Sequence, residues 1–193
     1  MARLAIVLID QFADWEGAQL AASARADLGD HVRWLSPGGH AVRSMGGLSA
    51  RVDGAVEDFE PAHADALVFI GSPLWQTEES PVLTPTARMA ADAGLIIGGI
   101  CGATLQLARA GLLNQRAHTS NSLAFLRQYA AGYHGEAHYR DVPQAVSEGR
   151  VITASGLAPS TFAGEMLKAL HPDKLDYVNQ DLAQFAREHV GRA

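Results

Sequence analysis

Five short apolar runs constrain the fold of this chain more than any other feature of its sequence. Their residues are almost continuously apolar instead of alternating with polar ones, which is typical of strands covered on both faces. The runs are Leu4–Ile9, Val32–Leu35, Leu67–Ile70, Leu95–Ile100 and Val151–Thr153. We therefore expect them to form the buried strands of one mostly parallel sheet.

Helix-like stretches alternate with these strands. Three of them end at a glycine, the residue that most often adopts the left-handed conformation past a helix, and these are Trp15–Leu28, Pro85–Ala93 and Ala103–Ala110. Two more are predicted near the end of the chain, one capped by Ser160 and one that opens at Pro172. The segment Val42–Val52, centred on two glycines, predicts a β-hairpin. This pattern predicts a single α/β domain over residues 1–193, with helices on both faces of the sheet.

The composition excludes several classes of protein. The chain has 193 residues, 48% of them hydrophobic, and a formal net charge of −6. The apolar content is too high for a disordered chain, and the acidic balance argues against a nucleic-acid partner. One cysteine, Cys101, leaves no intramolecular disulfide and no multi-cysteine zinc site. No apolar run approaches the roughly 18 residues of a membrane span, so we expect a soluble, cytoplasmic protein with no membrane partner.

The sequence offers no motif for a cofactor or a metal. It contains neither a G-x-G-x-x-G nor a Walker A loop. Asp10, Asp14 and Glu16 follow the first predicted strand, at the sheet edge where ligands bind, and these acids would repel a phosphate. His134 and His138 have helical spacing, but the glycines around them argue against a helix. We therefore expect no cofactor and no bound metal.

The fourth apolar run leads directly into the only cysteine of the chain. Gly99-x-Cys101-x-Ala103 has the form of a nucleophile elbow, a strained turn between a strand and a helix that presents the nucleophile. Two backbones pass close together there, so the neighbours must be small, and residues 98, 99, 102 and 103 are glycine or alanine. A lone cysteine is more often a small buried apolar residue, but this context favours a nucleophile.

The position of Cys101 at the start of a helix predicts its chemistry. The helix dipole and the free N–H groups favour the thiolate over the thiol. The N–H of Gly102, the next residue, is placed to donate to an oxyanion.

Several segments together resemble the ThiJ/PfpI superfamily of class I glutamine amidotransferase-like proteins. The similar segments are Leu4–Glu16, Asp65–Ser72, the turn at Cys101, His118–Asn121 and Val151–Gly156, and they span nearly the whole chain. The resemblance implies a flavodoxin-like three-layer sandwich and a homodimer. It also implies a small-molecule substrate with a carbonyl or amide, in the range of 2-oxoaldehydes, glycated adducts, amides and peptides.

The resemblance assigns roles to individual residues. Glu16 matches the glutamate that shares a hydrogen bond with the elbow cysteine in the family, so the catalytic pair would be Cys101 and Glu16. Gly71 corresponds to the second oxyanion donor of the family, beside Gly102. Ile70 and Ser72 replace the proline and the last glycine of that loop, so this loop departs from the family pattern.

The sequence departs from the family wherever a histidine would serve the cysteine. Protease-like members carry a histidine directly after the cysteine, where this chain has Gly102, and the late His-x-Glu of the glutaminases falls in Ser155–Pro159. The deglycase branch carries one near Asn121, which could instead orient the substrate or the sulfur. His118 is the nearest candidate for a general base, but in a strand it would point away from Asn121, so a structural role competes with a catalytic one.

Three functions stay open on the sequence alone. In the first, Cys101 attacks a carbonyl or amide, Gly71 and Gly102 hold the oxyanion, and Glu16 holds or relays a proton. In the second, the protein senses oxidants without turnover, and Cys101 oxidises to a sulfinate beside Glu16; the absence of an expected histidine favours this reading somewhat. In the third, the fold serves only as a binding scaffold.

Overall fold

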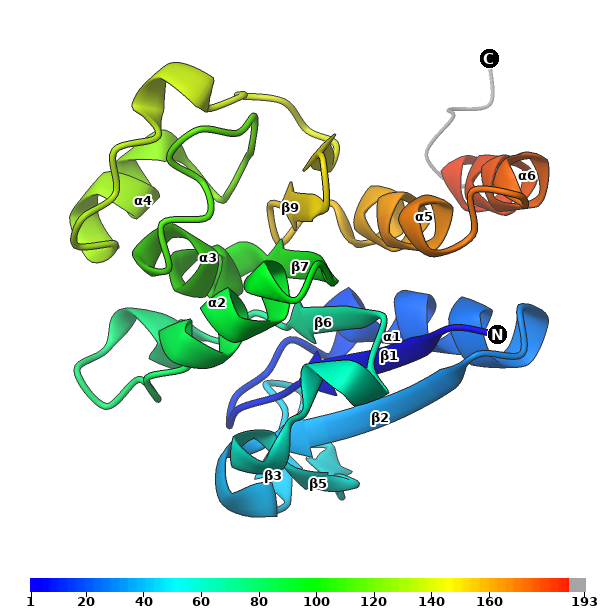
Figure 1. Ribbon diagram of the computed structural model, residues 1–193, viewed down its shortest axis with the longest axis horizontal. Coiled ribbons are helices and arrows are strands. Elements are labelled where there is room, and N and C mark those ends of the chain that lie inside the picture. Colours follow the sequence, from blue (N-terminus) through cyan, green and yellow to red (C-terminus); the bar gives the residue numbers. More distant parts are fainter. Residues whose placement is uncertain (188–193) are drawn as a thin grey trace.

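A computed structural model describes residues 1–187, and the end of the predicted domain, residues 188–193, lies outside the described part (Figure 1). Its main sheet has seven strands in the order β5-β2-β1-β6-β7-β9-β8. The strands are β1 Arg3–Val7, β2 His31–Ser36, β5 Gly54–Ala55, β6 Ala66–Phe69, β7 Ile96–Ile100, β8 Val146–Glu148 and β9 Val151–Ala154. All neighbours pair in parallel except β8 and β9. The five predicted strands are confirmed, whereas the short edge strands β5 and β8 were not predicted.

Helices cover both faces of this sheet. They are α1 Asp14–Ala22, α2 Thr84–Asp92, α3 Thr104–Arg109, α4 Leu123–Tyr129, α5 Pro159–Leu170 and α6 Leu175–Ala186. Helices α1 and α5 pack on one face with α6 against α5, and α2 and α3 pack on the other (Figure 1). This confirms the three-layer α/β arrangement. Within residues 1–187, no helix is long and apolar enough to cross a membrane.

Two helix starts differ from the sequence expectation, and one helix was not expected. Helix α5 begins at Pro159, and Ser160 lies inside its first turn instead of capping it. Proline suits the first position of a helix because an N–H there would have no partner within the helix and because its φ is already helical. Helix α6 begins at Leu175 and not at Pro172, since residues 172–174 form a turn closed by the bond from the Lys174 N–H to the His171 carbonyl oxygen. Helix α4 was not predicted.

The predicted hairpin is confirmed and is anchored beside α1. Strands β3 Val42–Arg43 and β4 Ser49–Ala50 pair antiparallel. Asp14, the first residue of α1, accepts hydrogen bonds from the Ser44 hydroxyl and from the Gly46 N–H. These bonds hold the hairpin against the start of α1, and they hold the pKa of the Asp14 carboxyl below its usual value.

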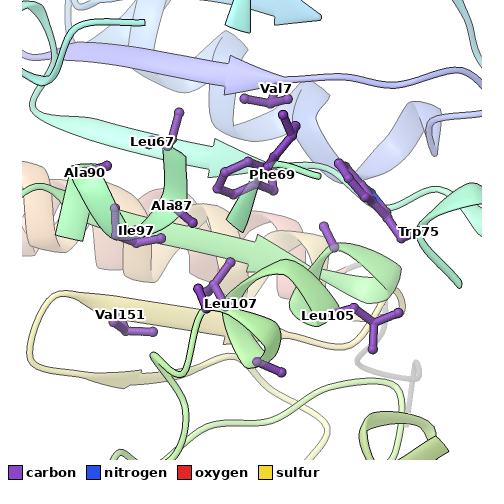
Figure 2. Close-up of a cluster of buried hydrophobic side chains, with 14 of the residues drawn as sticks. Val7, Leu67, Phe69, Trp75, Ala87, Ala90, Ile97, Leu105, Leu107 and Val151 are labelled. Atoms are coloured by element: carbon purple, nitrogen blue, oxygen red, sulfur yellow. The ribbon is translucent and has the colours of Figure 1, made fainter. Parts of the chain in front are cut away.

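The continuous apolar character of the strands follows from the two cores that they separate. Successive strand residues point to opposite faces, so Val7, Leu67 and Ile97 pack with α2 and α3 in the core shown in Figure 2. Their neighbours Ile6 and Val68 pack with α1 and α5 in the second core. A strand buried on both sides favours apolar residues, and Thr153 of β9 is tolerated because its hydroxyl accepts a hydrogen bond from the Thr119 N–H.

The order of the strands places four loops at one edge of the sheet. The chain leaves β1 toward β2 on one side and returns to β6 on the other. In parallel α/β sheets, the crevice at such a switch point, outside the carboxyl ends of the strands, is where ligands bind. The loops that follow β1, β6, β7 and β9 therefore meet at the edge that carries the candidate site.

The close packing of β7 on α5 generates a test of the fold. A Cβ atom on Gly98 would lie 2.8 Å from Met166 Sδ and 3.0 Å from Phe162 Cζ. We expect Gly98→Ala to lower the free energy of unfolding, measured in urea, by about 1–3 kcal/mol, as for other overpacked sites.

Gly54→Ala is the matched control, because its Cβ would meet only Arg33 Nη2 at 3.4 Å and Leu35 Cδ2 at 3.7 Å. Both changes restrict the unfolded chain alike, so the difference between them reports the crowding. Equal stability of the two variants would contradict the packing described for β7.

Candidate active site

Five residues from separate parts of the chain meet at the carboxyl edge of the sheet. Glu16 comes from the first turn of α1, Gly71 follows β6, Cys101 follows β7 and Gly156 follows β9. Asn121 comes from the loop before α4. The fold thus brings together the predicted pair, Cys101 and Glu16, with two of the other residues singled out from the sequence, Gly71 and Asn121.

Cys101 has the backbone of a nucleophile elbow. Its φ is 57°, in the left-handed region that non-glycine residues rarely adopt, so the turn is strained as the sequence predicts. A Cβ atom on Gly102 would lie 2.7 Å from the Ser72 carbonyl oxygen. The residue after the cysteine must therefore be glycine, and this geometry explains why no histidine follows Cys101.

Glu16 is completely buried and only half satisfied. Its Oε2 accepts a hydrogen bond of 2.8 Å from the Gly71 N–H. Its Oε1 has no hydrogen-bond partner within the described residues. Burial raises the pKa of Glu16 to about 7, against the opposing effects of the Gly71 N–H and of Cys101. The carboxyl group is therefore poised to change its charge at neutral pH.

The bond from Gly71 to Glu16 corrects one expectation. Gly71 was predicted to supply the second N–H of an oxyanion hole, but this N–H is already donated to Glu16 Oε2. The reason is that the Glu16 carboxylate is completely buried and needs a hydrogen-bond donor from the protein, because water cannot supply one. In this structure Gly71 positions Glu16, and Gly102 stays the predicted oxyanion donor.

Two glycines enclose the pair of Cys101 and Glu16. A Cβ atom on Gly156 would lie 2.8 Å from Cys101 Sγ and 3.0 Å from Glu16 Oε1. A Cβ atom on Gly71 would lie 2.5 Å from Glu16 Oε2 and 2.6 Å from Cys101 Cβ. The sulfur and the unbonded carboxylate oxygen thus face the same small space, which backbone alone can border.

Asn121 contacts the sulfur directly. Its Nδ2 lies 3.3 Å from Cys101 Sγ and donates to it, while its Oδ1 accepts a 3.0 Å bond from the Gly156 N–H. The second bond fixes which way the amide faces, since a backbone N–H needs an acceptor. Asn121 therefore presents an N–H donor to the sulfur at the position where a histidine was expected.

The surroundings of Cys101 favour the thiol, not the thiolate that its place before a helix predicted. Burial raises its pKa to about 11, and the negative charge of Glu16 adds to that rise. Asn121 and the Gly102 N–H act in the opposite direction but are outweighed. The following helix, α3, has six residues and begins only at Thr104, so its dipole is a weak influence on the sulfur. As the pH rises, Glu16 therefore loses its proton at a lower pH than Cys101 does.

His118 is a structural residue: of the two roles that the sequence left open for it, the structure supports the structural one and not the general base. It is fully buried, with Nδ1 2.7 Å from the Arg116 carbonyl oxygen and Nε2 2.6 Å from the Tyr133 hydroxyl. Its ring also packs edge-on against Tyr133 and Tyr139. Burial lowers its pKa and keeps the ring neutral. Both ring nitrogens are engaged, so neither is available to Cys101.

A cavity of about 600 Å³ opens beside Cys101. Its wall includes residues that the sequence did not single out as part of the site, namely Trp15, Asp141 and Gly156. Trp15 donates its indole N–H to the Gly156 carbonyl oxygen at 2.9 Å. The position of Gly156 directly after the last buried strand could have revealed it, whereas Asp141 lies in an irregular loop that carries no such signal. Within residues 1–187, no group of three or more potential ligands is arranged to hold a metal.

Comparisons with known proteins identify the family of this chain and agree with its fold. The model of the DJ-1/PfpI family matches residues 2–169. The chain is 32% identical to the uncharacterized protease YdeA of Bacillus subtilis, over 93% of this chain and 92% of that protein. It is 37% identical to the uncharacterized protease YoaZ of the same organism, over 69% of this chain and 65% of that protein. Among solved structures, it resembles the DJ-1 superfamily protein Atu0886 from Agrobacterium tumefaciens, with 43% identity, a TM-score of 0.92 and coverage of 98% and 100% of the two chains.

The charge balance of the pair predicts how the sulfur reacts with pH. Only the thiolate is alkylated, so the rate of iodoacetamide reaction follows thiolate formation. We expect the midpoint for Cys101 to lie above the ~8.5 of an ordinary thiol, because burial and the Glu16 carboxylate both disfavour the anion. Glu16→Gln removes the negative charge and should lower the midpoint, so the variant reacts faster at pH 8, by about tenfold for each unit by which the pKa falls.

Asn121→Ala serves as the opposing control, because it removes a donor to the sulfur and should raise the midpoint. The single cysteine makes the readout unambiguous. A wild-type midpoint below that of an ordinary thiol, or slower reaction after Glu16→Gln, would overturn this description of the pair.

Proposed function

This chain belongs to the DJ-1/PfpI family, and from that premise we propose that it is a cysteine-dependent hydrolase acting on a carbonyl or amide at Cys101. The names of its relatives YdeA and YoaZ, both uncharacterized proteases, support a hydrolytic reaction in this branch. The elbow backbone of Cys101 supports a nucleophilic role, because strain of this kind persists at sites where a side chain must be presented.

One observation carries the proposal: the buried Oε1 of Glu16 borders the same space as the sulfur, and the Cys101 thiol, which lowers the pKa of Glu16, is the one donor beside it within the described residues. A buried acceptor without a partner costs stability, and its retention here fits a group that receives a proton during the reaction. A pKa of about 7 suits a general base at neutral pH. Glu16 thus takes the role that a histidine holds in other cysteine enzymes.

The proposed reaction moves one proton back and forth between the pair and the substrate. As Sγ attacks the carbonyl carbon, Glu16 Oε1 accepts the thiol proton and the carbonyl π electrons move to oxygen. For an amide, collapse of this intermediate expels the amine, which takes the proton from Glu16 and leaves a thioester on Cys101. Water then attacks the thioester and gives a proton to Glu16, which returns it to the departing sulfur. The cycle consumes one water and leaves the enzyme unchanged.

Two donors are placed to stabilise the oxyanion. The Gly102 N–H and the Asn121 Nδ2 both face the sulfur and lower the pKa of its thiol. A carbonyl oxygen bound next to the sulfur would meet the same two donors. Because Gly71 is occupied by Glu16, Asn121 replaces it as the second donor in this proposal.

The raised pKa of the thiol favours this proposal over redox sensing. Cysteines that react readily with peroxide are low-pKa thiolates with free access to solvent. Cys101 is partly buried and its pKa is raised to about 11. Such a sulfur needs a base at the moment of attack, and Glu16 is the group in contact with it.

Turnover of a substrate panel tests the proposal. The panel contains a p-nitrophenyl ester, an unblocked and a blocked peptide amide, and methylglyoxal as the 2-oxoaldehyde. We expect the wild type to hydrolyse an ester or amide of the panel and to leave methylglyoxal, which has no leaving group, unhydrolysed. Cys101→Ala should show no hydrolysis, and Glu16→Gln should lose about 10²–10⁴-fold in kcat. Because Glu16 must be ionised to act, kcat/KM should rise with pH through a midpoint of about 7, and Glu16→Gln should lose this limb.

Glu78→Gln removes an exposed carboxylate that is not part of the site and should leave both the rate and the pH profile unchanged. Turnover that survives Cys101→Ala would remove the nucleophile from the account. A Glu16→Gln variant with full activity and an unchanged pH profile would remove the base.

A further inference from the structure

A second cavity continues from the one that contains Cys101. It has a volume of about 780 Å³ and lies where the loop after β9 meets α5 and α6. Trp15, Pro143, Gly156 and Leu157 line both cavities. The two spaces adjoin at these residues, and we treat them as two parts of one groove, into whose second part a molecule held at the sulfur can extend.

The second part of the groove carries no charged side chain. Its lining is mostly small and apolar, with Ala158 before α5 and Leu182 and Ala183 of α6 among its residues. The polar side chains in it, such as those of Gln144, Thr161 and Asn179, are uncharged. The part that contains Cys101 is different, because Asn121 and the Asp141 carboxylate lie in its wall. A ligand that fits both parts has a polar reacting end and an uncharged, apolar extension.

The junction of the two parts is lined by exposed apolar side chains. Leu157 has 94% of its surface exposed, the highest value among the large hydrophobic residues of the described chain. Trp15 is 49% exposed, and its indole N–H is held by the Gly156 carbonyl oxygen. Apolar surface that stays open to water at the mouth of a site gains stability when a ligand covers it.

We propose that this groove, lined by Trp15, Leu157, Leu182 and Ala183, is a specificity subsite for an apolar arm attached to the carbonyl that reacts at Cys101. The inference rests on the proposed function and narrows its substrate class. The substrate is an amide or ester with an aliphatic or aromatic arm of several carbons. A two- or three-carbon 2-oxoaldehyde would leave the whole groove empty.

Alkylation of Cys101 tests the subsite without any need for turnover. The probes are iodoacetamide, N-hexyl iodoacetamide, and 6-(iodoacetamido)hexanoic acid, which has an arm of similar length with a negative end. Intact mass gives the rate at the single cysteine. We expect the hexyl reagent to react at least about tenfold faster than iodoacetamide, the gain for burying about two methylenes, with saturation at high reagent concentration. The charged reagent should lose most of this gain.

Ala183→Trp fills the groove on α6 at an exposed position and should abolish the advantage of the hexyl arm while iodoacetamide keeps its rate. Ala183→Asp is a second variant that places a charge there and should do the same. Gln184→Trp is the matched control, because this neighbouring exposed residue does not line the groove, and it should retain the preference.

The outcomes separate the two proposals. A hexyl preference that Ala183→Trp and Ala183→Asp remove supports the subsite, even if no member of the substrate panel is hydrolysed. Equal rates for the three reagents would overturn it, whether the groove is empty or covered by another copy of the chain. A preference that persists in both Ala183 variants would also overturn it, because the arm would then bind elsewhere.

Discussion

The hydrogen bond from the Gly71 N–H to the buried carboxylate of Glu16 is the interaction on which the rest of the site depends. It joins the loop after β6 to the first turn of α1, across the switch point of the sheet. A buried carboxylate is costly unless donors compensate it, and this one has a single donor for two oxygens. The remaining oxygen borders the same space as the Cys101 sulfur, which is why we propose that it accepts the thiol proton.

This arrangement restricts what the neighbouring residues can be. Gly71, Gly102 and Gly156 each lack the space for a Cβ atom, because the sulfur, the carboxylate or a backbone oxygen lies in its place. Glu16 is completely buried and Cys101 is partly buried, and this burial raises the pKa of both groups.

The sequence predicts the parts of this structure that follow from local pattern. Continuous apolar runs identify the strands, and the small residues around Cys101 identify the elbow, since both are consequences of backbone geometry. The parts that it misses are set by tertiary contacts. They include the hydrogen bonds from Gly71 to Glu16, between His118 and Tyr133, and from Asn121 to the Cys101 sulfur. These bonds join residues up to 55 positions apart in the sequence. The raised pKa of Cys101, where a lowered one was expected, has the same origin. The burial that outweighs the short helix dipole arises from tertiary packing, which the local sequence does not show.

Infrared spectroscopy of the resting protein is the most direct measurement of the central claim, that Glu16 ionises before Cys101. The single thiol gives one S–H stretch, and the difference between wild type and Glu16→Gln isolates the protonated carboxyl band of Glu16. The account predicts that the carboxyl band disappears with a midpoint of about 7 while the S–H band persists at pH 8. A spectrum at pH 8 with no S–H band and a protonated Glu16 would contradict it, because the proton would then rest on the carboxylate and the sulfur would already be an anion.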